Sequence, residues 1–145
     1  MTTKEIQEKI VSTMEKWRKI EDASVASTGR VIAKTSNPLV RLVMEIIQTD
    51  SQMHHRVQQM IADGMSVKAM SISPDELEEV WDLIENHIKI EKQTIELAEG
   101  LLEVVEGKKL VVVEYLLSYL GQDEKKHDAL LAALEGIKKG MYPYG

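Results

Sequence analysis

The sequence contains no cysteine among its 145 residues. This absence excludes disulfides, iron–sulfur clusters, thiolate zinc sites and cysteine nucleophiles. No apolar run approaches the roughly 18 residues that a membrane-spanning helix needs, and the polar start Met-Thr-Thr-Lys-Glu-Ile is unlike a signal peptide. The formal net charge of −6 disfavours nucleic acid as a partner. We therefore expect a soluble, cytoplasmic protein whose partners include neither nucleic acid nor membrane.

Proline is also scarce, because the chain has only three, at Pro38, Pro74 and Pro143. The pairs Asn37-Pro38 and Ser73-Pro74 are each typical of an N-cap followed by proline at the first helical position. Glu76 follows Ser73 at the spacing of a capping box. Glycines stand where helices are expected to end, at Gly64, Gly107 and Gly140.

These marks divide the chain into four segments whose apolar residues recur at spacings of three and four, the pattern of an amphipathic helix. The segments are 3–35, 38–63, 74–106 and 109–138. Short connections predict that the first helix pairs with the second, and the third with the fourth, as antiparallel hairpins. We predict an all-α, ferritin-like four-helix bundle that forms one domain over residues 1–145, with its core at about 3–138 and a short C-terminal tail. The link 64–73 allows either a crossover along the bundle or an up-down-up-down topology.

Each apolar stripe carries ionisable residues near its middle. This central layer consists of Glu21, Asp50, His54, His87, Glu91, Asp123, Glu124 and His127. Burying such groups without partners costs several kcal/mol, and no lysine or arginine lies on the same layer of the stripes. A divalent metal ion neutralises clustered carboxylates beside imidazoles most simply. A buried salt-bridge network is the alternative.

The central layer is also duplicated along the chain. Lys-Ile-Glu occurs at 19–21 and again at 89–91, and Asp-x-x-x-His occurs at 50–54 and again at 123–127. The order of the two motifs is the same in both halves. Two hairpins, each offering a glutamate from its first helix and a histidine from its second, would give a pseudo-twofold site.

This pattern resembles the ferritin-like di-iron carboxylate proteins, especially the rubrerythrin-type domain, over about residues 10–135. That family places one glutamate on each of two helices and Glu-x-x-His on each of the other two. The resemblance implies that Glu21 and Glu91 are the single glutamates. It also implies that Glu124 and His127 form one complete Glu-x-x-His, and that His54 is the histidine of the other.

The resemblance assigns Asp50 and Asp123 to the aspartates that hold a ligand histidine. Ser51 departs from the pattern, because it stands where the fourth glutamate belongs. His87 lies four residues before Glu91, on the same helix face, and could replace the missing ligand or be an ordinary core histidine. We therefore expect an asymmetric site for two iron ions, one held more weakly, with zinc or manganese as alternatives.

The resemblance implies a non-haem iron oxidoreductase that acts on peroxide or dioxygen, or a protein that handles iron. A full rubrerythrin also carries a rubredoxin-like centre on four cysteines, so this chain would need an external electron-donor protein. A second copy of the chain, forming a homodimer, is another possible partner. The alternatives are a non-enzymatic metal-binding or sensing bundle, and a metal-free helical interaction protein whose polar layer specifies register. Five apolar residues around the layer are expected to exclude water: Ile47, Val57, Ile84, Leu120 and Leu130.

Overall fold

The computed structural model describes residues 1–140, and all regular secondary structure in this range is helical, as predicted. The described residues form α1 (Thr3–Lys34), α2 (Pro38–Ser66), α3 (Pro74–Glu78), α4 (Trp81–Val105) and α5 (Val111–Lys138). None of these helices combines the length and apolarity needed to cross a membrane. The predicted tail at 141–145 lies outside the described residues.

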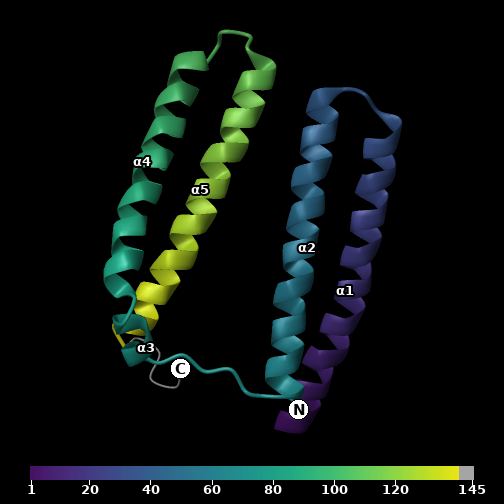
Figure 1. Ribbon diagram of the computed structural model, residues 1–145, viewed down its shortest axis with the longest axis vertical. Coiled ribbons are helices and arrows are strands. Elements are labelled where there is room, and N and C mark those ends of the chain that lie inside the picture. The colour runs from purple at the N-terminus through teal and green to yellow at the C-terminus, as the bar shows by residue number, and fades with distance from the viewer. Residues whose placement is uncertain (141–145) are drawn as a thin grey trace. The chain divides into compact units, whose positions relative to one another are not determined.

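The helices belong to two compact units, Met1–Met70 and a second that begins at Ser71. In the first unit α1 and α2 lie antiparallel along each other, and we call this pair the first hairpin (Figure 1). In the second unit α4 and α5 form the second hairpin, and the short α3 contacts both of its helices. These are the two antiparallel helix pairs that the short connections predict.

The predicted N-terminal caps are confirmed. Asn37 Oδ1 accepts hydrogen bonds from the backbone N–H groups of Leu39 and Val40 at 3.0 and 3.1 Å. Ser73 Oγ accepts from the Glu76 N–H at 3.3 Å, and Glu76 Oε2 accepts from the Ser73 N–H at 2.7 Å. Both helix starts are therefore fixed by interactions local in the sequence.

The predicted end of the second helix and the predicted continuity of the third are wrong, and close side-chain packing accompanies both differences. Helix α2 continues past Gly64 to Ser66. Met70 approaches Gly64 so closely that its Cε lies 2.7 Å from where a Cβ would stand. The predicted helix 74–106 is broken between α3 and α4, where Val80 has φ −118° and ψ 4°. This break is accompanied by burial of Leu77 and Trp81 on either side of it.

The fourth helix begins at Val111, two residues later than predicted, because the chain first turns through left-handed backbone conformations. Gly107 has φ +70° and Lys109 has φ +58°. Gly107 does follow the end of α4, as predicted, and Gly140 with φ +73° follows the end of α5. A positive φ favours glycine, which explains two of the three predicted stop positions.

Each hairpin buries little beyond the contact line between its two long helices. Of the residues expected to exclude water, Ile84 is half-buried, but Ile47, Val57, Leu120 and Leu130 are 41%, 52%, 49% and 63% exposed. These four side chains are exposed within their own hairpins, and their burial in a complete bundle stays a prediction. Two helices cover only one stripe of each other, so neither hairpin buries these residues by itself.

Candidate metal centre

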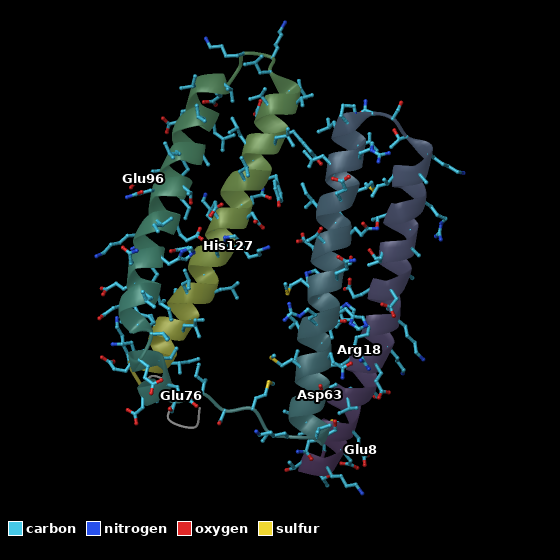
Figure 2. All side chains as sticks on the ribbon, in the orientation of Figure 1. Glu8, Arg18, Asp63, Glu76, Glu96 and His127 are labelled. Atoms are coloured by element: carbon cyan, nitrogen blue, oxygen red, sulfur yellow. The ribbon has the colours of Figure 1, made fainter. Side chains whose placement is uncertain are left out.

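The second hairpin brings together three of the predicted ligands. Glu91 from α4, and Glu124 and His127 from α5, each offer one ligand atom, and these atoms lie within 4.8 Å of one another. Glu124 and His127 share a face of α5 because they are three residues apart. His127 lies midway along α5 (Figure 2). Glu91 is buried at the contact line, and the other two residues are partly accessible.

The two oxygens of the Glu91 carboxyl group have different surroundings. Oε1 lies 2.8 Å from His87 Nε2 and 3.4 Å from His127 Nδ1. Oε2 is buried and has no hydrogen-bond partner among the described residues. A buried carboxylate oxygen without a donor is costly. A proton or a cation at this position would remove that cost.

The surroundings of His127 fit a metal ligand. Its Nε2 lies 3.5 Å from Asp123 Oδ2, while its Nδ1 lies 3.4 Å from Glu91 Oε1 and 3.5 Å from Glu124 Oε2. With the proton on Nε2, the Nδ1 lone pair faces two carboxyl groups. Metal-bound histidines typically direct their other N–H toward a carboxylate. The contact with Asp123 is the one that the resemblance implies.

The carboxyl groups of Glu91 and Glu124 influence each other's protonation. When Glu124 is protonated, its hydrogen bond to Glu91 raises the pKa of Glu124 and lowers the pKa of Glu91. Burial raises the pKa of Glu124 as well, whereas the hydrogen bond that Thr94 Oγ1 donates to Glu124 Oε2 at 3.1 Å lowers it. The pair therefore accommodates one proton, or a cation in its place.

His87 contacts Glu91 but is not one of the three groups that converge. Its side chain is half exposed, and its Nε2 points to the oxygen of Glu91 that His127 also approaches. In this geometry His87 orients the Glu91 carboxylate. A ligand role for His87 stays a prediction.

The first hairpin reproduces one contact of the second. His54 Nδ1 lies 3.5 Å from Glu21 Oε1, and the same pair of atoms lies 3.4 Å apart in His127 and Glu91. Glu21 is buried like Glu91. The sequence repeat is therefore also a repeat of side-chain geometry.

The rest of the first hairpin's layer differs from the second. Ser51 is buried, and its Oγ lies 2.9 Å from Ser24 Oγ. Gln58 Nε2 donates to Glu21 Oε1 at 3.5 Å. Within residues 1–140 no ion pair joins Asp50 to His54, so the predicted role of Asp50 has no counterpart to the contact of Asp123 with His127. Neutral groups thus take the place of the second carboxylate.

Two hydrogen-bond donors at these sites, Gln58 and Thr94, are not among the residues predicted from the sequence. Gln58 follows His54 by four residues, and Thr94 follows Glu91 by three. Each spacing places the donor on the face of the residue it follows. The spacing is therefore the sequence signal for these two donors, which carry no charge.

We compared the chain with known protein families, curated proteins and solved structures. No protein-family model, curated protein or solved structure matches the chain.

Proposed function

We propose that the chain binds a divalent metal ion through Glu91, Glu124 and His127. The observation that carries this proposal is the buried Glu91 Oε2, which has no hydrogen-bond partner among the described residues and belongs to a cluster with a second carboxyl group and an imidazole nitrogen. Two carboxylates and one imidazole suit a first-row divalent ion. Iron is the ion we propose, with zinc or manganese as alternatives.

The surrounding residues would hold the ligands in place. Asp123 faces the Nε2 of His127 and favours the tautomer whose Nδ1 is free to bind a cation. His87 contacts Glu91, and Thr94 donates to Glu124. These partners reduce the freedom of the two carboxylates before any ion binds.

We further propose that this centre serves iron handling or a non-haem iron oxidoreductase activity of the ferritin-like type, in a four-helix arrangement. Bound iron would supply one-electron chemistry toward dioxygen or peroxide. The chain has no cysteine with which to hold a rubredoxin-like centre, so electrons would come from a separate protein.

Metal titration tests the binding proposal. Metal-free protein is titrated with Fe(II) under anaerobic conditions, and bound iron is measured after gel filtration. Glu91→Gln should weaken binding by more than about 100-fold, beyond the roughly 10–100-fold loss typical of an outer-shell partner. The matched control is Glu96→Gln, since Glu96 lies on the same helix and points away from α5 (Figure 2). Equal affinity in the two variants would overturn the proposal.

A second measurement tests the redox proposal separately. The ferrous protein is mixed with peroxide in a stopped-flow spectrometer, with the Glu91→Gln variant and free Fe(II) as references. An absorbance change faster than that of free iron supports oxidoreductase chemistry. A rate equal to that of free iron would leave metal binding intact and favour a sensing or storage role.

A further inference from the structure

The second hairpin offers only part of a metal coordination shell. Three side chains converge there, and divalent cations in proteins take four to six or more ligands, so further positions are open to water or to groups of another molecule. Two carboxylates balance one divalent ion. Two such sets, placed face to face, would offer four carboxylates and balance two ions.

The first hairpin is poorly suited to supply the missing half. It offers one carboxylate, Glu21, whose Oε1 already contacts His54 and Gln58. Ser51, at the position of Glu124 in the repeat, is bonded to Ser24 and brings no charge. Within residues 1–140, the buried side-chain oxygen without a partner is the neutral amide oxygen of Gln58 in the first hairpin, whereas in the second hairpin it is a carboxylate oxygen of Glu91.

The two hairpins also differ in the surface beside the site. Helix α4 carries a stripe of residues seven apart, Leu83, Ile90, Leu97 and Val104, which are 75%, 46%, 67% and 66% exposed. The positions 70 residues earlier in α1 are Thr13, Ile20, Ser27 and Lys34, of which one is apolar. An exposed apolar stripe indicates a contact surface, and here it belongs to the hairpin that holds the fuller ligand set.

Two further features of the second hairpin favour close contact with another helix. Gly100 lies inside α4 between Leu97 and Val104, and a Cβ there would meet nothing within 4 Å. Glycine inside a helix costs stability but permits close approach of a neighbouring backbone. On α5, Leu120 and Leu130 near His127 are exposed as well. Their equivalents on α2, Ile47 and Val57, are also exposed, so the difference between the two hairpins lies on α4.

We propose that the second hairpins of two copies of this chain pack through these faces and build one two-metal centre from Glu91, Glu124 and His127 of both copies. A twofold interface brings the same patch of each copy together, which supplies the second ligand set without the first hairpin. This inference rests on the proposed metal binding and names the partner that completes the site.

The test uses the full chain with Mn(II) as the probe. Sedimentation velocity measures the mass with and without the ion, and electron paramagnetic resonance distinguishes a coupled pair of Mn(II) ions from an isolated ion. We expect one ion per chain and a coupled spectrum from a dimer. The double variant Glu21→Ala/His54→Ala should keep both properties, because neither residue belongs to the centre.

A matched pair of surface variants tests the interface without touching a ligand. Leu97→Lys should weaken dimer formation at least tenfold and remove the coupled spectrum, while Ser27→Lys, at the equivalent position of α1, should change neither. An isolated Mn(II) spectrum from a wild-type monomer, or loss of the coupled pair in Glu21→Ala/His54→Ala, would overturn the pairing and leave metal binding intact. Failure of the wild-type chain to bind Mn(II) or Fe(II) would overturn both proposals.

Discussion

At the scale of single residues, Glu124 makes the difference between the two hairpins. The Glu–His contact is the same in both, at 3.5 and 3.4 Å. Where the second hairpin has the Glu124 carboxyl group, the first has the Ser51 hydroxyl, which Ser24 satisfies. At this layer the second hairpin therefore has one carboxyl group more than the first, that of Glu124.

We expect Glu124→Gln to stabilise the metal-free protein at pH 7 by about 1.5–3 kcal/mol, the range for a hydrogen bond to a charged group. The amide can donate to Glu91 without a proton having to be taken up, and one of two adjacent negative charges is removed. Urea unfolding in the presence of a chelator measures the change. The same variant should lose metal binding, and a lower free energy of unfolding would contradict this account of the pair.

The carboxyl pair also predicts how the stability of the metal-free protein depends on pH. The folded-state pKa of Glu124 is raised above its ordinary value of 4.5, so its contribution is present below the unfolded pKa and is lost as the pH rises through the folded value. The pKa of Glu91 is lowered from 4.5, so its contribution is lost as the pH falls through its folded value. The pair should therefore stabilise the fold most at a pH between the folded-state pKa of Glu91 and the folded-state pKa of Glu124. Glu124→Gln should remove the loss on the alkaline side, and an unchanged pH profile would contradict the assignment.

Ser51→Glu tests whether the first hairpin can be given the missing ligand. Ser51 lines a surface pocket of about 290 Å³ together with Asp22 and His55, so a longer side chain has room. We expect the variant to bind one additional Fe(II) per chain and to be less stable without metal, because a buried carboxylate replaces the hydroxyl pair with Ser24. Metal analysis and thermal unfolding measure both effects. An unchanged metal content would show that Glu21 and His54 are not arranged to bind an ion.

At the scale of helices, the features that are local in sequence could be predicted and those that depend on packing could not. The caps at Asn37 and Ser73 involve groups two or three residues apart, so the sequence contains them completely. The continuation of α2 past Gly64 and the break at Val80 accompany contacts or burial of side chains such as Met70 and Trp81. Apolar periodicity does not record such contacts.

At the candidate site, too, some contacts follow from spacing along the sequence and others depend on packing between helices. The pairing of Glu91 with Glu124 and His127 follows from helix spacing and the hairpin, so the sequence predicts it. The hydrogen bond from Gln58 to Glu21 depends on rotamers across two helices. The burial of Ile47 and Leu120 was predicted from a complete bundle, and a hairpin alone leaves both exposed.

The glycines inside two helices should respond differently to alanine. Gly100→Ala should raise the helix stability of α4 by roughly 0.5–1 kcal/mol, because the added Cβ meets nothing within 4 Å. Gly64→Ala should gain less or lose stability, because its Cβ would stand 2.7 Å from Met70 Cε and displace that side chain. Chemical unfolding of the two variants in a chelator compares them, and equal gains would contradict the close approach of Met70.

At the scale of the whole molecule, the two tryptophans report on different units. Trp17 lies on α1 and Trp81 opens α4, where it is buried and lies 5.2 Å, measured to the ring centroid, from Lys138 Nζ. With Trp17→Phe, fluorescence follows the second hairpin through Trp81. With Trp81→Phe, it follows the first hairpin through Trp17.

We expect Fe(II) or Mn(II) to raise the unfolding free energy reported by Trp81, by about 2.7 kcal/mol at a free-ion concentration 100 times Kd. The unfolding reported by Trp17 should not change. Fluorescence-detected urea unfolding of the two single-tryptophan variants makes the comparison. An equal shift in both would show that the two units unfold as one.

The matched Glu–His contact in the two hairpins has a practical consequence. Temperature, ionic strength and buffer composition act on both copies in the same tube, so the copy in α1 and α2 serves as an internal reference for the copy in α4 and α5. The difference between the responses of His127 and His54 then reflects the contacts that the second hairpin adds, among them those of His127 with Asp123 and Glu124. One polypeptide therefore contains both the full ligand cluster and a simpler Glu–His pair with which to compare it.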